Sequence, residues 1–344
     1  MSPSIGFAIV GSGHVSRYHH TAIKALAYRG ARLVAVATRD PANATDIQDR
    51  YQVPALGFAD ICRHPGVAVV AVCTPSGDHA AKTIAAARAG KHVIVEKPMA
   101  VTTADAEQMI SECATHQRLL AVAFQRRTQP LFKQLKRLVD EGALGTPLMA
   151  SLVLPYQRNR AYFEAAPWRG TWGQDGGGVL MNQGIHLIDL LVWLWGNPVT
   201  VEALTARRLH QIETEDTAAV LLGFANGALA TITATTAVSP GFSHRLELFG
   251  TQGGVRIEGD AVVDCRLAEG DGLAAMAGAE DADTAWSEGG KAAGHIALYT
   301  NFIDALERGV PLVCDGRQGQ RSLSLIEQIY SVAEPKTLAS PPPA

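Results

Sequence analysis

The first third of the chain alternates between two patterns of hydrophobic and polar positions. Short runs rich in Val, Ile and Ala, such as residues 6–10, 32–37 and 67–73, are separated by stretches with helical spacing of apolar residues. Apolar strands joined by helices are typical of right-handed βαβ units around a parallel sheet. The pattern therefore predicts an α/β fold class with a doubly wound, Rossmann-type domain over residues 1–124.

After residue 125 the pattern favours an α+β domain that extends to residue 334. Two strand patterns flank Asn226-Gly227, a strong hairpin signal, and residues 245–259 contain a second strand pair. With strands near residues 147–154 and 199–206, we expect a large open mixed or antiparallel sheet of about six strands. One face should be covered by the helix that carries His186.

The remaining segments of the second half have their own patterns. Residues 268–292 are small and acidic, which is typical of a long loop. Helical patterns follow over residues 296–309 and 319–334, and the second of these helices is expected to return to the nucleotide domain. Residues 335–344 are predicted to form a flexible tail.

Composition excludes several classes of function. The chain has 344 residues, 47% of them hydrophobic, and a formal net charge of -3 without a basic stripe, so we expect neither nucleic acid nor a membrane as a partner. An apolar strand follows the N-terminus without a signal-peptide pattern, which favours a cytoplasmic protein. Five scattered cysteines without CxxC spacing predict neither disulfides nor a metal site.

A glycine-rich turn follows the first strand. Gly11 and Gly13 precede His14 and Val15 at the start of a helical pattern, with Ser16 where the dinucleotide fingerprint has a third small residue. Glycines allow a tight turn and close approach of backbone N–H groups to a pyrophosphate at a helix N-terminus. These residues are therefore candidates for binding a dinucleotide.

The end of the second strand bears on the choice of cofactor. Thr38 occupies the position where NAD-binding sites have an acid for the ribose 2'-hydroxyl, and Arg39 beside it suits a 2'-phosphate. NADP is therefore favoured, with NAD as the alternative. In that alternative Asp40 binds the ribose, although its place before Pro41 also suits a helix cap.

Several motifs along the chain resemble one known family. They are the glycine turn, Thr74-Pro75 with His79, Glu96-Lys97-Pro98, "FQRR" and "GGGVLMNQGIHLIDLL". Together they resemble the glucose-fructose oxidoreductase, inositol dehydrogenase and MocA family of NAD(P)-dependent sugar oxidoreductases, over nearly the whole chain. The resemblance implies that Thr74, Pro75 and His79 contribute to the cofactor site, and that Glu96 contacts or orients the nicotinamide end.

The resemblance places Lys97 between nicotinamide and substrate as a catalytic and cofactor-contacting residue. Glu96 and Lys97 also follow the apolar residues 93–95, at the expected carboxyl end of a parallel strand, where open α/β folds bind their ligands. A snorkelling surface cation is the alternative reading of Lys97. We further expect a constrained peptide at Lys97-Pro98 that fixes the direction of the lysine, with the cis form as one of its two options.

A second group of polar residues lies in an apolar helical pattern. Asn182 and His186 are four residues apart and are expected on one helix face, with Asp189 three residues further on. The family pattern usually has Asp where this chain has Asn182, and it implies that His186 acts on the substrate hydroxyl. Because an amide accepts no proton, His186 and Lys97 are expected to share the acid/base work. Asp189 could orient an imidazole or bind local backbone.

The segment of residues 155–175 is rich in Arg, Tyr and Trp and lacks periodicity. Flat rings and guanidinium groups suit a carbohydrate or a carboxylate. The substrate-binding candidates are Arg158, Arg160, Trp168 and Arg169, with Asn182 and His186. The "WRGTW" sequence also resembles the branch of the family that oxidises nucleotide-linked sugar acids.

These features predict an oxidoreductase that transfers hydride between a nicotinamide cofactor and a secondary alcohol of a sugar, polyol or sugar-acid derivative. One alternative is an NAD-dependent glycosidase of the same superfamily, and another is a dinucleotide-sensing protein without catalysis. The resemblance also implies a homo-oligomer, a dimer or tetramer, formed through the C-terminal sheet.

Overall fold

The structure is a computed structural model that describes residues 4–38, 41–272 and 288–333. The chain divides into two compact units. The first comprises Met1–Thr128 and Ser287–Gln320, and the second comprises Gln129–Trp286 and Arg321–Ala344. The sequence pattern had assigned all of residues 125–334 to the second domain, whereas the structure includes the segment 287–320 in the first unit.

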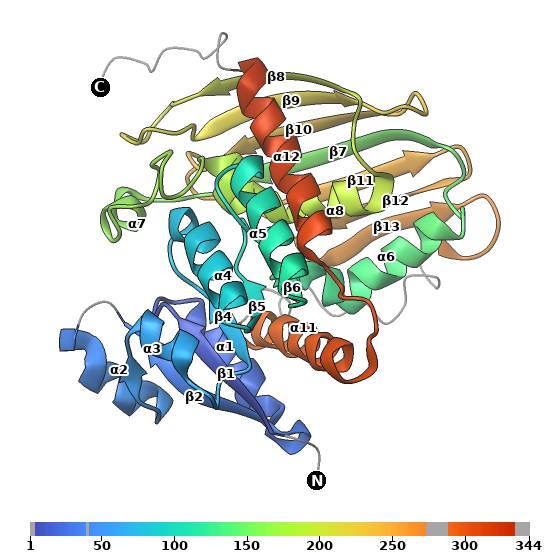
Figure 1. The fold of residues 1–344 in the computed structure, drawn as a ribbon. Coiled ribbons are helices and arrows are strands. Elements are labelled where there is room, and N and C mark those ends of the chain that lie inside the picture. Colours follow the sequence, from blue (N-terminus) through green and yellow to red (C-terminus); the bar gives the residue numbers. More distant parts are fainter. Residues whose placement is uncertain (1–3, 39–40, 273–287, 334–344) are drawn as a thin grey trace. The chain divides into compact units, whose positions relative to one another are not determined.

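The first unit contains a six-stranded parallel sheet with the order β3-β2-β1-β4-β5-β6, which confirms the doubly wound fold (Figure 1). Every residue of β1 and β4 is buried, as expected for strands covered on both faces. The strands are β1 Ile5–Val10, β2 Ala31–Ala37, β3 Ala55–Leu56, β4 Val69–Val72, β5 His92–Val95 and β6 Leu120–Val122.

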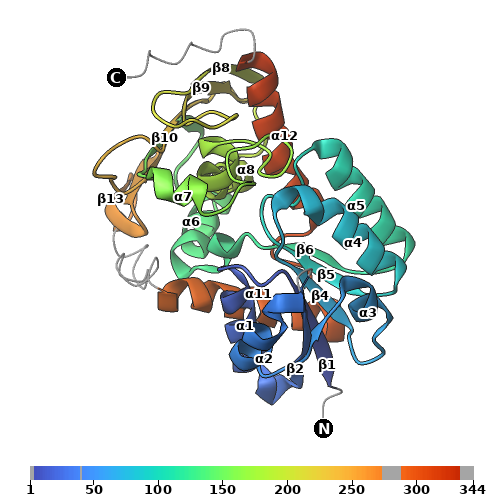
Figure 2. The same cartoon turned by 90° about the vertical axis from the view of Figure 1, so that its left-hand side faces the viewer.

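Helices cover both faces of this sheet, with α4 and α5 on one face and α1 and α11 on the other (Figure 2). The helix α5 begins after Thr102, whose side chain accepts a hydrogen bond from the backbone N–H of Asp105. The helices of the first unit are α1 Ser16–Ala25, α2 Ala44–Tyr51, α3 Phe58–Arg63, α4 His79–Arg88, α5 Thr103–Thr115 and α11 Glu288–Arg308.

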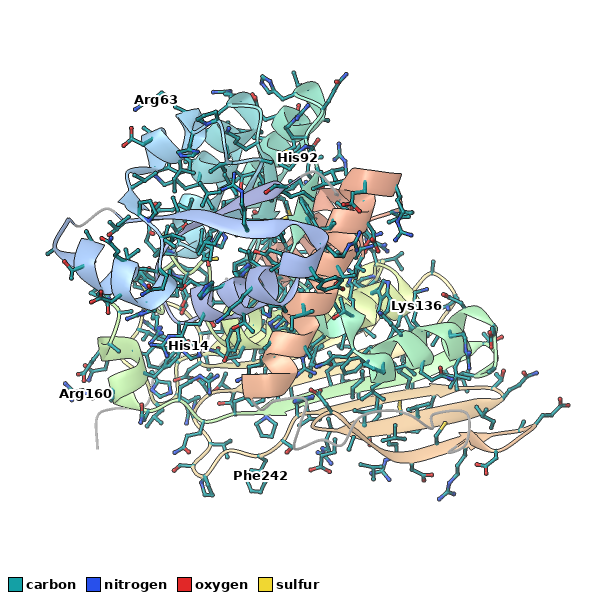
Figure 3. The ribbon with its side chains drawn as sticks, turned by 90° about the horizontal axis from the view of Figure 1, so that it is seen from below. His14, Arg63, His92, Lys136, Arg160 and Phe242 are labelled. Atoms are coloured by element: carbon teal, nitrogen blue, oxygen red, sulfur yellow. The ribbon has the colours of Figure 1, made fainter. Side chains whose placement is uncertain are left out.

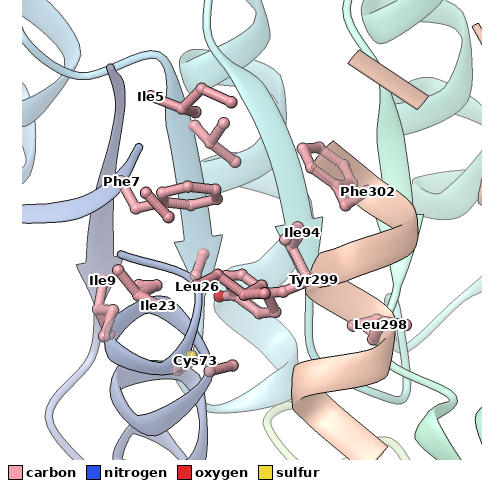
Figure 4. Packing of buried hydrophobic residues seen from close by; sticks show 14 of the residues in the cluster. Ile5, Phe7, Ile9, Ile23, Leu26, Cys73, Ile94, Leu298, Tyr299 and Phe302 are labelled. Atoms are coloured by element: carbon pink, nitrogen blue, oxygen red, sulfur yellow. The ribbon is translucent and has the colours of Figure 1, made fainter. Parts of the chain in front are cut away.

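The core of the first unit depends on α11. Its Leu298, Tyr299 and Phe302 pack against strand residues that include Phe7, with 5.4 Å between the ring centroids of Phe7 and Tyr299 (Figure 4). The helix predicted for residues 296–309 begins earlier, at Glu288. Its first turns are rich in Gly and Ala, so apolar periodicity could not reveal them.

The second unit is built around a seven-stranded mixed sheet with the order β13-β12-β11-β7-β10-β9-β8. The hairpin at Asn226-Gly227 is confirmed, because β9 and β10 pair antiparallel across it, whereas β7 pairs parallel to β10. The strands are β7 Pro147–Pro155, β8 Thr200–Ala206, β9 Thr217–Gly223, β10 Leu229–Thr235, β11 Arg245–Gly250, β12 Gly253–Glu258 and β13 Ala261–Leu267.

The expectation of about six strands is wrong by one, because β13 was not recognised. It is an edge strand in which only Cys265 is buried, so its hydrophobic alternation is weak. The expected loop of residues 268–292 lies largely outside the described residues, as does the expected tail of residues 335–344.

The helices of the second unit include a π-helical stretch, η5 Val179–Gly184, which contacts β9 and β10. It runs directly into α8 Ile185–Trp195, which is buried on almost its whole circumference. The others are α6 Pro130–Asp140, α7 Arg160–Glu164 and most of α12 Gly316–Ala333. Among the described residues, none of the helices is long and apolar enough to cross a membrane.

Candidate active site

The two glycines of the first turn have different structural roles. Gly11 has a φ of 105°, and a Cβ there would lie 2.6 Å from the carbonyl oxygen of Cys73. A Cβ on Gly13 would meet no atom of the structure within 4 Å. Gly11 is therefore required by the fold, whereas Gly13 leaves open space at the start of α1, which fits the close approach of a dinucleotide pyrophosphate.

Side chains of the first helix close this turn. Ser16 replaces the third glycine, and its hydroxyl donates to the carbonyl oxygen of Gly13 and lies 2.7 Å from the hydroxyl of Tyr51. The Nε2 atom of His14 lies 3.2 Å from the hydroxyl of Tyr18. The backbone of Val15 starts the helix. The turn is thus held in part by Tyr18 and Tyr51, two buried tyrosines that the sequence pattern did not identify.

We predict that Gly13→Val weakens dinucleotide binding by about tenfold or more, since its side chain would occupy the open space, while thermal stability changes little. Gly11→Ala is the contrasting variant and should lower the free energy of unfolding by about 1–3 kcal/mol, because its backbone is strained. Fluorescence titration with NAD(H) and NADP(H) and thermal melts would measure both effects. Unchanged cofactor affinity in Gly13→Val would contradict the assignment of the turn.

His79 joins the two turns that the family resemblance assigns to the cofactor. It is 1% exposed, and its ring nitrogens each lie 2.8 Å from a carbonyl oxygen, one of Thr74 and one of Pro98. Burial lowers the pKa of His79, although hydrogen bonds to the two carbonyls oppose this. The Lys97-Pro98 peptide is cis, as expected. His79 therefore supports the loops around Lys97.

The neighbouring cofactor candidates are only partly described. The hydroxyl of Thr74 is buried and has no hydrogen-bond partner among the described residues, which fits a donor or acceptor reserved for a bound molecule. Pro75 precedes the short helix η3 Ser76–Asp78. The backbone N–H of Thr38 donates to the carbonyl of Leu56, whereas Arg39 lies outside the described residues.

Lys97 is the only residue of positions 93–100 that is not fully buried. It follows β5 at the carboxyl edge of the parallel sheet, where this fold class binds ligands. Its backbone N–H donates to the Oε2 atom of Glu96 at 3.2 Å. The carboxylate of Glu96 therefore holds the backbone from which the lysine side chain projects.

Glu96 also accepts hydrogen bonds from two buried histidines that sequence reasoning missed. Its Oε1 atom lies 2.9 Å from Nε2 of His19 on α1 and 3.4 Å from Nε2 of His295 on α11. The other ring nitrogens contact the hydroxyl of Tyr299 and the carbonyl of Lys291. One carboxylate thus joins two helices to the end of β5.

Burial and hydrogen bonding act oppositely on these groups. Burial alone would raise the pKa of Glu96, but hydrogen bonds from His19 and His295 lower it well below its usual range. Burial lowers the pKa of His19. A neutral His19 can donate to Glu96 and accept from Tyr299, which satisfies both of its ring nitrogens. Glu96 therefore stays ionised and engaged in these two hydrogen bonds.

In the second unit, Asn182 and His186 do not lie on one regular α-helix as predicted. Asn182 belongs to η5 and His186 to α8, because the stretch that follows the three glycines adopts π-helical geometry before the α-helix begins. Asn182 donates through Nδ2 to the Oδ1 atom of Asp175 at 2.7 Å. Asp189 accepts from Ser322 at 2.7 Å and so connects α8 to α12. His186 is 9% exposed.

The turn before Asn182 is held by Glu215, which the sequence did not indicate. Its carboxylate accepts from the backbone N–H groups of Gly178 at 2.9 Å and Leu180 at 3.0 Å, and from the hydroxyl of Tyr330 at 3.0 Å. Burial raises the pKa of Glu215 to about 7, although these hydrogen bonds oppose the shift. Its charge state therefore changes near neutral pH.

We predict that the wild type loses stability relative to Glu215→Gln as the pH rises from about 4.5 through about 7, because the folded state binds the Glu215 proton more tightly than the unfolded chain. The contribution of protonated Glu215 to the free energy of unfolding, about 3 kcal/mol, is fully present below the pKa of the unfolded chain. It is lost as the pH rises through the pKa of the folded state. Urea unfolding between pH 4 and 8 would measure this. The groups other than Glu215 are the same in both proteins, so a difference between wild type and Glu215→Gln that does not change with pH would contradict the raised pKa of Glu215.

The arginine-rich segment separates into two groups. Arg158 and Arg160 line a cavity of about 500 Å³ together with apolar residues such as Phe163. Arg160 on α7 borders this cavity, but its side chain is largely exposed and its Nε atom lies 2.5 Å from Glu164 (Figure 3). Arg169 instead lies over the rings of Tyr162, at 4.1 Å, and Trp168, at 5.6 Å. Two of the four candidates thus line a cavity large enough for a ligand.

A parallel sheet with a glycine turn at its first strand and a lysine at the carboxyl edge defines a dinucleotide-binding protein. Comparison with known proteins agrees with this class. Residues 5–124 match the model described as "Oxidoreductase family, NAD-binding Rossmann fold", and residues 132–256 match the GFO/IDH/MocA C-terminal domain.

The chain is 28% identical to inositol 2-dehydrogenase from Rhizobium meliloti (strain 1021), covering 98% of this chain and 99% of that protein. It is 25% identical to mouse trans-1,2-dihydrobenzene-1,2-diol dehydrogenase, covering 74% of this chain and 75% of that protein. The crystal structure of the WlbA dehydrogenase from Bordetella pertussis, in complex with NADH and UDP-GlcNAcA, matches with a TM-score of 0.87 and 30% identity over 96% of this chain and 97% of that chain.

The chain therefore belongs to the GFO/IDH/MocA family, and it is an oxidoreductase with an NAD-binding Rossmann domain.

Proposed function

We propose that this enzyme transfers hydride between a nicotinamide cofactor and a secondary alcohol of a sugar, polyol or sugar-acid derivative. The observation that carries the proposal is Lys97, a partly exposed lysine at the carboxyl edge of an NAD-binding sheet. The names of the relatives support the substrate class, since they act on or bind inositol, a dihydrodiol and a nucleotide-linked sugar acid.

In this proposal Lys97 takes the proton of the substrate hydroxyl, and His186 binds that hydroxyl and assists the transfer. A bound nicotinamide supplies the hydride acceptor or donor. Gly13 and Thr74 form part of its site, since one leaves open space and the other offers a buried hydroxyl without a partner among the described residues. Glu96 holds the backbone of Lys97 in place.

The cavity beside α7 favours a substrate with an extended, anionic part over a free polyol. Its volume of about 500 Å³ and its arginines suit a phosphate- or carboxylate-bearing group. The experiment is a panel of inositols, free sugar acids and nucleotide-linked sugar acids, followed by nicotinamide absorbance. Turnover of free NAD(P) with none of these classes would contradict the proposed function.

We further propose that the enzyme prefers NADP, since Thr38 replaces the usual acid and Arg39 suits a 2'-phosphate. The WlbA complex contains NADH, so the preference needs a direct comparison. Arg39→Ala should weaken NADP binding by about 1–3 kcal/mol and leave NAD binding unchanged. Titration of both cofactors measures this, and equal losses for both would overturn the preference.

The outer face of the second sheet is proposed as the surface of a homo-oligomer, a dimer or tetramer. Four large apolar side chains on neighbouring strands are between 45% and 54% exposed there, namely Met149, Leu204, Leu221 and Leu229. Apolar patches of this kind mark interaction surfaces. Light scattering on the purified protein would give the oligomeric state.

A further inference from the structure

We propose that Asp175 is a positioning residue that fixes the amide of Asn182 so that the amide oxygen, an acceptor that cannot be protonated at neutral pH, faces the substrate hydroxyl. The inference rests on the proposed function and goes beyond it, because it assigns a role to a carboxylate outside the helical motif.

The orientation of the amide follows from its contact with Asp175. The Nδ2 atom of Asn182 donates to Oδ1 of Asp175 at 2.7 Å, so it is the nitrogen end of the amide that faces the carboxyl group. The two ends of a planar amide point in different directions. The oxygen of Asn182 is therefore directed away from Asp175.

Asp175 is itself held in place. It is 2% exposed, and its Oδ2 atom accepts from the backbone N–H of Gly170 at 2.9 Å. Its backbone N–H donates to the carbonyl of Thr171. A buried carboxylate with both oxygens engaged cannot rotate without losing a hydrogen bond. The orientation of Asn182 is thus set by the loop that precedes the motif.

A second polar group lies beside this pair. Asn182, Asp175 and Thr236 line the same cavity, whose volume of about 10 Å³ admits no more than about one water or one hydroxyl group. Thr236 is 2% exposed, and its hydroxyl has no hydrogen-bond partner among the residues that the structure describes. A buried hydroxyl of this kind is normally satisfied by water or a ligand. The cavity therefore offers a hydroxyl in addition to the amide that Asp175 orients.

The contact between Asp175 and residue 182 would shift the pKa of a carboxyl group introduced at position 182. In Asn182→Asp two carboxylates would lie within hydrogen-bond distance, and like charges so close share one proton with a raised pKa. Among the described residues, Glu215 lines the same cavity and accepts from the hydroxyl of Tyr330 on α12, and His186 follows in the next helix. Because these groups are present in the wild type, comparison with the wild type removes their contribution.

An exchange of the two side chains tests the proposal. In Asp175→Asn the amide oxygen of the new side chain still accepts from the backbone N–H of Gly170. The nitrogen of the same side chain then faces Asn182, and the amide of Asn182 must rotate so that its oxygen accepts from this nitrogen. The double variant Asp175→Asn, Asn182→Asp keeps both hydrogen bonds and again presents an oxygen to the substrate. We expect kcat/KM to fall about tenfold to a hundredfold in Asp175→Asn and to recover to within a few fold of the wild type in the double variant. Full activity of Asp175→Asn, or no recovery in the double variant, would overturn the proposal.

A measurement of stability tests the contact without any substrate. The melting temperature of Asn182→Asp, relative to wild type, should fall as the pH rises from about 4 to 8, because the shared proton is lost. The double variant should not show this decline, nor should Asp140→Asn, a control on the surface helix α6. A pH profile of Asn182→Asp parallel to that of the wild type would disprove the paired orientation.

These two measurements separate the inference from the proposed function. If the wild type oxidises no member of the substrate panel, the proposed function fails, and the stability profile alone decides whether Asp175 orients residue 182. If the wild type is active and the exchange does not restore kcat/KM, the positioning role fails while the oxidoreductase assignment stands.

Discussion

Replacing Lys97 with methionine should lower kcat by about 10⁴-fold or more, at the upper end of what a lost proton-transferring group costs. Methionine keeps much of the length and apolar character of the lysine stem but has no ammonium group. Cofactor affinity should stay nearly unchanged, because the Glu96 carboxylate still accepts from the backbone N–H of residue 97. Steady-state kinetics across pH, with parallel cofactor titrations, would test the expectation.

Two further variants make the result specific. Lys24→Met applies the same chemical change to an exposed lysine of α1 in the same unit and should leave kcat unaltered. His186→Ala should cost less than Lys97→Met, about 10² to 10⁴ in kcat, since it removes the assisting group. If Lys97→Met retains most of the wild-type rate at every pH, the lysine is structural and the assigned chemistry is wrong.

Substituting Gly178 with alanine should lower the free energy of unfolding by about 4 kcal/mol, among the largest effects of a single change. A Cβ at this position would lie 1.6 Å from the carbonyl oxygen of Glu215 and 2.8 Å from its Oε2 atom. Since the first of these is a backbone atom, the turn before η5 would have to move. Urea denaturation measures the loss, and a lower kcat should accompany it because Asn182 and His186 follow this turn.

Gly173→Ala is the matched control for this prediction. Gly173 lies in the same loop, and a Cβ there would meet no atom of the structure within 4 Å. The same one-methyl change should alter stability by no more than about 0.5 kcal/mol. If Gly178→Ala and Gly173→Ala had the same free energy of unfolding, the turn could move away from Glu215 without loss of stability, and the prediction would be wrong.

The sequence revealed those parts of the fold that have local signals. Continuous apolar runs predicted the buried strands β1 and β4, and Asn226-Gly227 predicted the hairpin of β9 and β10. The edge strand β13 and the first turns of α11 escaped prediction because they bury few large apolar side chains or consist of small ones. Such elements are stabilised by tertiary packing, which local pattern does not show.

The candidate site was predictable to a similar degree. Lys97 and the glycine turn lie within short motifs, so one stretch of sequence is enough to find them. The supporting carboxylates have no such signal, because Glu215 is far in sequence from the turn it holds, and Asp175 acts through an amide seven residues away. His19 and His295 are distant in sequence but share one oxygen of Glu96.

The discontinuous composition of the first unit has a consequence for its biosynthesis. A growing chain makes Met1–Thr128 first, but Tyr299 and Phe302, which cover the apolar face around Phe7, are translated only after the intervening residues of the second unit. Until then the nascent sheet exposes apolar surface, as aggregation-prone folding intermediates do. Nearly the whole polypeptide must therefore be translated before the core of the first unit can be completed, and a chain shortened before residue 287 is expected to leave this apolar face uncovered.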